Sequence, residues 1–448
     1  MSDETAPLLD DRNIPNLART GNGHDEIAAA INRVQAAANR RAWIYAVLTA
    51  VFVVALVSML FFWDKVGSVG RLPSDPHEAA LVIMKGAPVI DGHIDLPGMA
   101  RWIEANNVSA IDLSKPWIGH VDIPRLREGH VGGFFWSTYV DCPAPGTEGK
   151  DFLNSTWRVR DTLEQIDVSK LLIQKHSDTF EYATTAEGMK TAMSRGKIAS
   201  VLGIEGGHQL GNSIQVLRMV YELGVRYVTL THTCHNAFAD SCGFVKDFEP
   251  YWGGLSPLGL SLIDEMNRIG MLVDLSHTSD DTARQALKHS KAPVMWSHSS
   301  SRAVYDHARN VPDDVLKLVG FGRDQKDAVI MVNFYPEFVK GKTATVQDIA
   351  DHVDHIANVT GRSHVGIGSD YDGIGSVPEG LEDVSKYPNL IAELYSRGWT
   401  AYELAGLTGG NFLRVMAGAE RVAAALQKAN MPPITAVYDK RTDMNRSF

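Results

Sequence analysis

The chain has 448 residues, of which 44% are hydrophobic and 21% charged, and its formal net charge is −10. This is the composition of a folded globular protein, and it excludes collagen, coiled coil and a wholly disordered chain. The acidic balance, with no basic run that alternates with aromatic residues, argues against binding to nucleic acid.

Residues 1–41 form a polar tail that we expect to be largely disordered, and residues 42–63 follow as a run without charge, glycine or proline. Twenty-two residues at about 1.5 Å each span about 33 Å, enough to cross a bilayer as a helix. Trp43, Tyr45 and Trp63 lie at the two ends, as aromatic rings do at membrane interfaces. We therefore predict a transmembrane signal anchor rather than a cleaved signal peptide or a buried core helix.

The charges beside this run favour a cytosolic N-terminus, because Arg40 and Arg41 precede it directly. The rest of the chain is then expected in a lumen or outside the cell. Four Asn-x-Ser/Thr acceptor sites agree with this orientation: Asn107, Asn154, Asn358 and Asn445. The pair Leu8-Leu9 after Glu4 resembles an acidic dileucine signal for endosomes or vacuoles, although an accidental pair explains it equally well.

One pattern repeats eight times between residues 86 and 430: an apolar run, then polar side chains, then usually a helical period. The apolar runs are 88–91, 132–140, 198–204, 226–231, 270–276, 293–297, 328–334 and 364–369. The helical periods are 152–176, 212–223, 256–269, 279–290, 312–319 and 346–360, followed by 387–398 and 401–429. Continuous apolar runs suit strands that are buried on both faces. We therefore predict a (β/α)8 TIM-type barrel over 86–430, between a linker at 64–85 and a C-terminal tail at 431–448.

In such a barrel the catalytic residues lie where the strands end. Those positions hold His93, Asp95, Glu205, His232, His277, His298, Asn333, Tyr335 and Asp370. The second predicted strand ends in nothing of this kind. Because the chain has sixteen histidines and three cysteines, the residues at these ends predict a metal site of imidazole and carboxylate ligands.

The spacing of these residues indicates how they share metal ions. His93 and Asp95 are two positions apart on an extended segment, so both side chains point toward one ion. His277 and His298 are candidates for a second ion, and Glu205 for a bridging carboxylate. Two ions about 3.5–4 Å apart would trap a hydroxide as nucleophile and polarise a carbonyl. The predicted chemistry is hydrolysis of an amide or an ester.

Residues near these ligands have less specific signals. Asp370 is nearer its strand end than Asp372, so we assign proton transfer to Asp370 and a turn to Asp372. Arg309, in ARNVPDD, is either a surface arginine or, near a metal site, an arginine that pairs with a substrate carboxylate. His208 and His235 are expected to form hydrogen bonds or to face solvent.

A series of motifs gives the chain a family resemblance. They are DGHIDLP, GIEGGH, VTLTHTCHNAFADS, LVDLSHTS, PVMWSHSS, RNVPDDVL, MVNFY, GIGSDYDG and VPEGLEDVSKYPNL. In this order, over about 86–425, they resemble the membrane (renal-type) dipeptidases, peptidase family M19. The resemblance implies a zinc-dependent barrel with two Zn²⁺ ions per subunit that cleaves the peptide bond of dipeptides through a metal-bridging hydroxide.

The resemblance also implies a role for each site residue. His93 and Asp95 match the ligands of one zinc ion, His277 and His298 those of the other, and Glu205 the bridging carboxylate.

For the substrate, His232 matches a histidine that contacts it and steadies the tetrahedral intermediate. Arg309 matches the arginine that binds the dipeptide carboxylate. Asp370 matches the acid that moves the proton and meets the substrate amine. Tyr335 is expected to line the substrate site.

Cysteines and assembly are likewise expectations from the family. Cys142 and Cys234 match a family disulfide, whereas Cys242 is left unpaired. Ile94 stands where many members have Asn, which changes contacts around the ligands but not the ligand set. A homodimer is typical of the family and is expected here.

Two other functions stay open at this point. Another barrel hydrolase, such as a deacylase or deaminase, usually carries His-x-His on its first strand, and the His93-x-Asp95 of this chain favours a dipeptidase. A non-catalytic member that binds ligands or membrane proteins would typically have lost a metal ligand, and none is missing from the sequence.

Overall fold

The computed structural model describes residues 33, 35–37, 39–54, 72–142, 156–243 and 248–441. The chain divides into two units, Met1–Leu72 and Pro73–Phe448. In the first unit, residues 39–54 are helical and exposed. Within the described residues, no helix is both long enough and apolar enough to span a bilayer. Residues 55–63 of the predicted anchor lie outside them.

Strands form the centre of the second unit. Its described part contains β1 Val89–Ile94, β2 Val131–Thr138, β3 Phe180–Tyr182, β4 Ile198–Ile204, β5 Val225–Thr229, β6 Leu272–Asp274, β7 Val294–Trp296, β8 Ala328–Val332 and β9 Val365–Ile367. Eight of these run parallel in the order β1-β2-β4-β5-β6-β7-β8-β9, and β9 pairs with β1 through Ile367 and Asp91. The sheet is therefore a closed barrel of the TIM type, and each of the eight predicted runs coincides with one of its strands.

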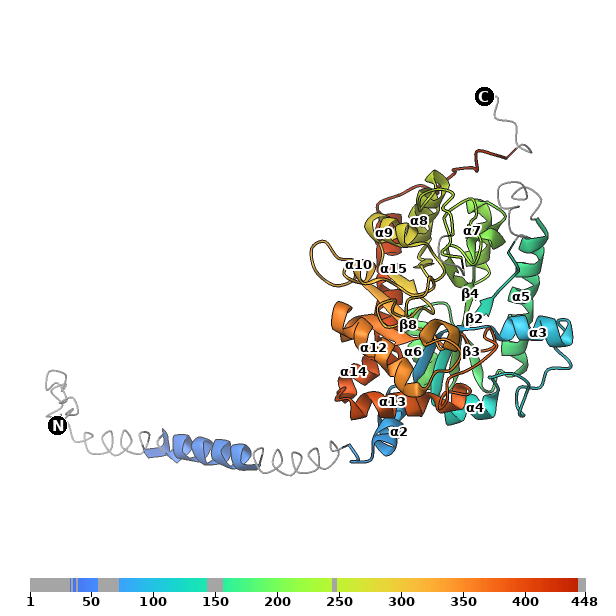
Figure 1. Ribbon diagram of the computed structural model, residues 1–448. Helices are drawn as coiled ribbons and strands as arrows, with labels where there is room; N and C mark the ends of the chain where they lie inside the picture. Colours follow the sequence, from blue (N-terminus) through green and yellow to red (C-terminus); the bar gives the residue numbers. More distant parts are fainter. Residues whose placement is uncertain are drawn as a thin grey trace, which may run out of the picture. The chain divides into compact units, whose positions relative to one another are not determined.

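Helices surround this barrel (Figure 1). They are α2 Pro76–Gly86, α3 Leu96–Glu104, α4 Ile123–Glu128, α5 Thr156–Lys175, α6 Ala186–Ser194, α7 Ile214–Glu222, α8 Pro257–Ile269, α9 Asp280–His289, α10 Asp313–Leu316, α11 Pro336–Val339, α12 Val346–Thr360, α13 Tyr387–Ser396, α14 Ala401–Ala405 and α15 Asn411–Lys428. Short helical turns are η1 Gly207–Leu210, η2 Arg362–His364, η3 Val384–Lys386 and the π-helical η4 Gly406–Gly410. The eight helical periods predicted from the sequence all contain helix.

Several elements were not predicted from the sequence, namely the helices α2, α3, α4, α6 and α11 and the strand β3, and two of these illustrate the reason. The strand β3 pairs with the first three residues of β4, whereas β5 pairs with the last three, so both lie along one edge of β4. Its three residues, FEY, are too short to form a periodic pattern. The helix α2 forms within the predicted linker 64–85. Asp75 caps it by accepting the backbone N–H of Glu78 at 2.8 Å, and its buried side chains, such as Ile83 and Met84, stabilise it.

The strands are buried because both of their faces are covered. Every residue of β1, β2, β4 and β8 is buried. Side chains such as Phe135, Val201 and Met331 form a common apolar cluster with α15 residues such as Phe412. This is the reason for runs without polar alternation in the sequence.

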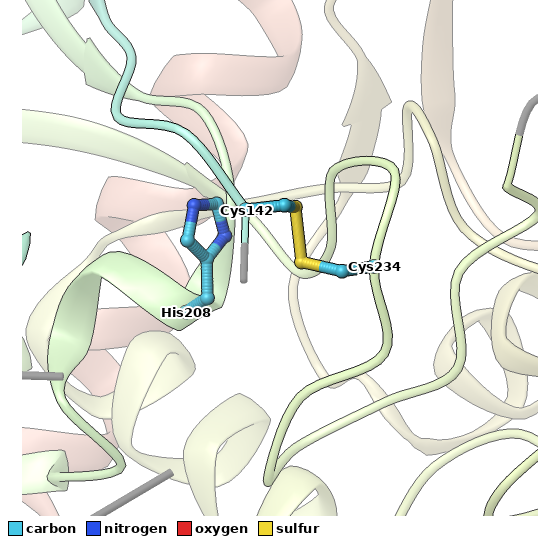
Figure 2. A group of neighbouring side chains, drawn as sticks. All are labelled: Cys142, His208 and Cys234. Atoms are coloured by element: carbon cyan, nitrogen blue, oxygen red, sulfur yellow. A yellow bond between two sulfur atoms is a disulfide. The ribbon is translucent and has the colours of Figure 1, made fainter. Parts of the chain in front are cut away.

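A disulfide joins the loops that follow two barrel strands. Cys142, after β2, is bonded to Cys234, after β5, which confirms the pairing that the family resemblance implied. His208 of η1 lies beside this disulfide (Figure 2). Its Nε2–H donates to the carbonyl oxygen of Val140 at 2.7 Å. Cys242 is a free thiol.

Candidate active site

Polar side chains from the carboxyl ends of the barrel strands surround a cavity of about 180 Å³. It is lined by Asp95, Trp102, Tyr139, Glu205, His232, His277, Tyr335, Phe338, Asp370, Gly373 and Ile374. Asp95 and Glu205 directly follow β1 and β4, and Asp370 lies three residues after β9. Loops at one end of the barrel therefore bring residues as distant in the chain as Asp95 and Asp370 to one cavity.

Glu205 is at the centre of this group. Its Oε1 lies near the Nε2 atoms of four histidines, at 2.9 Å from His277, 3.2 Å from His298, 3.6 Å from His93 and 3.7 Å from His232. The glutamate side chain is only 5% exposed. One buried carboxylate oxygen therefore faces four imidazole nitrogens.

A second group of oxygens lies near the same nitrogen of His93. Its Nε2 is 3.2 Å from Asp95 Oδ2 and 4.0 Å from Asp370 Oδ1. Asn333 Nδ2 donates to the other oxygen of Asp370 at 2.8 Å. A Cβ atom at Gly373 would lie 2.2 Å from Asp95 Oδ2, so glycine permits the close approach of this loop.

These ligand atoms fit a divalent cation. His277 Nε2 and His298 Nε2 are 2.9 Å apart and face the same carboxylate oxygen, an arrangement that a cation between them would stabilise. His93 Nε2 is buried and has no hydrogen-bond partner among the described residues. Three overlapping groups bring their ligand atoms within 4.8 Å: His93, Glu205 and His298; Glu205, His232 and His277; and His93, Asp95 and Asp370. Imidazole and carboxylate oxygen are the ligands of zinc and similar ions.

Burial raises the pKa of the carboxylates, which a bound cation would oppose, and lowers the pKa of the histidines, which a bound cation would reinforce. Loss of hydration raises the pKa of Glu205 and of Asp95 well above their usual values, and it raises the pKa of Asp370 to about 7. The same burial lowers the pKa of His277 and His298 well below 6.5. The imidazoles are thus neutral, the form in which a nitrogen lone pair binds metal.

The backbone around the cavity is strained. His277, Asp370 and Asp372 have positive φ angles of 62°, 68° and 68°. Residues with side chains rarely adopt this left-handed conformation, and such strain concentrates at functional sites. Asp372 accepts the backbone N–H of His120 at 2.6 Å, a contact between two loops that agrees with its expected role in a turn.

Arg309 lies behind the cavity rather than on its described wall. Its guanidinium donates to the carbonyl oxygen of His298 at 3.1 Å and to Ser299 Oγ at 3.4 Å, and the residue is 3% exposed. Both acceptors are neutral. Its Nε is buried without a hydrogen-bond partner in the described part of the chain, so the guanidinium retains a donor.

Part of the cavity wall was not predicted from the sequence. Tyr139 directly follows β2, and its ring lies 4.6 Å from that of His232. Its place near the end of the predicted run 132–140 is the signal in the sequence that marks it. Trp102 of α3 and Phe338 of α11 also line the cavity, and nothing in their local sequence marks them.

His235 has hydrogen-bond partners away from the cavity wall. Its Nε2 donates to the carbonyl oxygen of Glu249 at 2.8 Å, and its Nδ1 accepts the backbone N–H of Ser241 at 3.0 Å. Together with the contact of His208 to Val140, this agrees with a hydrogen-bonding role for both histidines.

The sequence model of the membrane dipeptidase family, peptidase family M19, matches residues 77–430. The chain belongs to this family. It is 45% identical over 365 residues to an uncharacterized dipeptidase of Schizosaccharomyces pombe, a match that covers 80% of this chain and 87% of the relative. The protein is accordingly a metallo-dipeptidase of family M19, and the resemblance noted in its motifs is confirmed.

Solved structures share the fold. A metallo peptidase from Rhodobacter sphaeroides, liganded with a phosphinate mimic of the dipeptide L-Ala-D-Ala, superposes with a TM-score of 0.65 at 24% identity, covering 74% of this chain and 99% of that one. The probable dipeptidase PvdM from Pseudomonas aeruginosa gives 0.69 at 22% identity, covering 78% and 100%. The barrel is thus shared across bacterial proteins of low sequence identity.

Proposed function

We propose that this M19 metallo-dipeptidase is zinc-dependent and holds two Zn²⁺ ions. His93 and Asp95 would hold one ion, His277 and His298 would hold the other, and Glu205 would be the carboxylate that both share. The observation that carries the proposal is the position of Glu205 Oε1, within 3.6 Å of the Nε2 atoms of all three histidine ligands. When bound, the ions supply an activated water and polarise the scissile carbonyl, the chemistry of amide hydrolysis.

The remaining residues bind the substrate and move protons. Asp370, whose pKa burial raises to about 7, takes the proton of the attacking water and returns it to the leaving amine. His232 is neutral because burial lowers its pKa, and its ring contacts the carbonyl oxygen of the substrate. Asp370 also meets the substrate amine, and Tyr335 lines the substrate site.

The substrate is a dipeptide because both of its ends are recognised. Arg309, with a donor left over from its contacts to neutral oxygens, binds the carboxylate. The dipeptide mimic bound by the Rhodobacter sphaeroides relative supports the same substrate class.

Hydrolysis by the intact chain tests the proposal. We expect cleavage of L,L and L,D dipeptides but not of a tripeptide, loss of activity with a chelator, and recovery when zinc is restored. Glu205→Gln keeps the size of the side chain and removes the charge that the two ions would share. We therefore expect this variant to lose dipeptidase activity. A folded protein that binds zinc and leaves every dipeptide intact would refute the dipeptidase reading of the site.

We also propose that residues 42–63 anchor the enzyme in a membrane, with a cytosolic N-terminus and a lumenal or extracellular barrel. The uncharged run and the arginines that precede it support this orientation. Asn107 and Asn358 are exposed on the barrel unit, so glycans there would mark it as lumenal. We expect a deglycosidase to lower the apparent mass, and unmodified asparagines would remove this support. We further propose that the protein forms a homodimer, as is typical of the family, and the molar mass from light scattering tests this.

A further inference from the structure

A buried carboxylate lies behind the proposed metal ligand His298. Asp274, the last residue of β6, is 0% exposed and accepts four hydrogen bonds. Its Oδ1 accepts the backbone N–H groups of Ser297 at 2.7 Å and of Ser276 at 3.2 Å. Its Oδ2 accepts the hydroxyls of Ser297 and Thr229, both at 2.6 Å. Four donors converge on this side chain, which suits the ionised, acceptor-only form of a carboxylate.

The contacts of Asp274 determine where the proton of Ser297 lies. A serine hydroxyl has one proton, and an ionised carboxylate only accepts, so Ser297 Oγ donates to Asp274. The approach of Ser297 Oγ to the neutral Ser276 Oγ is longer, 3.3 Å, and cannot compete with a charge-assisted bond of 2.6 Å. The Ser297 oxygen is then left as an acceptor.

This acceptor lies 2.8 Å from Nδ1 of His298. The only hydrogen bond that can form between them is Nδ1–H to Ser297 Oγ, so Nδ1 carries the ring proton. Neutral imidazole has a single ring proton, and Nε2 therefore presents a lone pair. Nε2 is the atom that lies 3.2 Å from Glu205 Oε1, on the cavity side of the ring.

We propose that Asp274 and Ser297 are positioning residues that keep the proton of His298 on Nδ1 and so direct its Nε2 lone pair at a metal ion. The inference rests on the proposed function, in which His298 is a zinc ligand. Hydrogen-bond partners of this kind change metal affinity about 10–100-fold when they are removed. Asp274 and Ser297 are not among the residues that line the cavity, so their effect would be transmitted through the imidazole.

An isosteric substitution reverses the chain of hydrogen bonds. In Asp274→Asn the amide oxygen must take the place of Oδ1, since two backbone N–H groups point at it. The amide NH2 then faces Ser297 Oγ and donates to it. Ser297 in turn donates to Nδ1 of His298, which moves the ring proton to Nε2 and blocks the metal-binding lone pair.

The double variant separates this effect from a structural one. Adding Ser297→Ala to Asp274→Asn removes the hydroxyl that forces the wrong tautomer, so His298 regains a free Nε2 lone pair. We expect the double variant to bind zinc more tightly than Asp274→Asn alone. If the two substitutions instead caused independent structural defects, their losses of zinc affinity would add. The double variant would then bind zinc more weakly than either single variant.

Thr229→Val is the matched control. Thr229 donates to the same carboxylate oxygen of Asp274 at the same 2.6 Å, but among the described residues it forms no hydrogen bond with Ser297 or with the His298 imidazole. Valine keeps its shape and removes one hydrogen bond. We expect zinc affinity to change by less than about threefold, well below the effect of a partner that orients a ligand.

The experiment measures Zn²⁺ dissociation constants of the intact chain by competition with a chromophoric chelator. Thermal unfolding of the metal-free proteins is measured beside it. We expect Asp274→Asn and Ser297→Ala each to lower the affinity for one of the two zinc ions about 10–100-fold. Of these two variants, Asp274→Asn should bind that ion more weakly. The double variant should recover part of the affinity that Asp274→Asn loses. If Asp274→Asn does not fold, the comparison of Ser297→Ala with Thr229→Val carries the test.

Two results would overturn the inference: equal affinities in Ser297→Ala and Thr229→Val, or a double variant weaker than both single ones. Failure of the proposed function is seen separately. In that case the unsubstituted protein itself fails to bind two zinc ions, whatever the variants do.

Discussion

His208 makes the stability of this enzyme depend on pH. Burial beside the Cys142–Cys234 disulfide lowers the pKa of its imidazole to about 4, from a usual value of 6.5, and this loss of hydration outweighs the hydrogen bond from Nε2–H to the carbonyl of Val140, which acts in the opposite direction. In the unfolded chain the imidazole takes up a proton near pH 6.5. The folded state does not bind that proton until the pH reaches about 4. Stability is therefore complete above pH 6.5 and is lost as the pH falls toward 4.

The size of the effect follows from the two pKa values. A difference of about 2.5 pKa units corresponds to about 3 kcal/mol when the transition is complete. Between pH 7 and pH 5 the linkage relation gives a loss of about 2 kcal/mol in the free energy of unfolding. His208→Gln keeps an N–H that can reach the carbonyl of Val140 and removes the titration. We expect this variant to lose about 2 kcal/mol less than the unsubstituted protein over that pH range.

Denaturant titrations of the intact, oxidised chain at pH 7, 6 and 5, followed by tryptophan fluorescence, measure this difference. Other buried histidines titrate in both proteins, so their contributions cancel in the comparison. His77→Gln is the control, because His77 is exposed on α2. Its free energy of unfolding should fall on acidification by as much as that of the unsubstituted protein. If His208→Gln and His77→Gln lose stability equally on acidification, burial of the His208 imidazole does not have the assigned effect.

Three further predictions concern catalysis and the disulfide. Asp370→Asn should lower kcat about 10²–10⁴-fold while zinc content stays unchanged, and loss of zinc instead would make Asp370 a ligand rather than a proton carrier. Asn333→Ala removes the donor that stabilises the Asp370 carboxylate, so the pKa of Asp370 should rise. The acidic limb of the pH profile of kcat/KM should therefore move to higher pH. An acidic limb at an unchanged pH would contradict this role of Asn333. The double variant Cys142→Ala, Cys234→Ala removes a disulfide that joins residues 92 positions apart, which should lower the free energy of unfolding by about 4–5 kcal/mol in denaturant titrations. An unchanged midpoint of the unfolding transition would show that other contacts restrain the loop.

Local patterns in the sequence were sufficient to predict the barrel and the gathering of the candidate site residues at one of its ends. Eight apolar runs became the eight barrel strands, because strands covered on both faces need continuous apolar residues. The polar residues that follow them, from His93 to Asp370, were expected together, because parallel strands end on one face. The short strand β3 and the helix α2 escaped prediction. The first carries too few residues for a period, and the second lies in a segment assigned to a linker.

Only the tertiary structure decided how these residues meet. Closure of the barrel places Glu205 Oε1 among four imidazoles, places Tyr139 on the cavity wall and sets Arg309 behind it. The direction of the hydrogen bonds from His298 through Ser297 to Asp274 likewise depends on three side chains held in one geometry. Sequence patterns report which face of a strand or helix is buried, because burial is a local requirement. Distances and proton positions depend on packing between distant segments, and no local pattern encodes them.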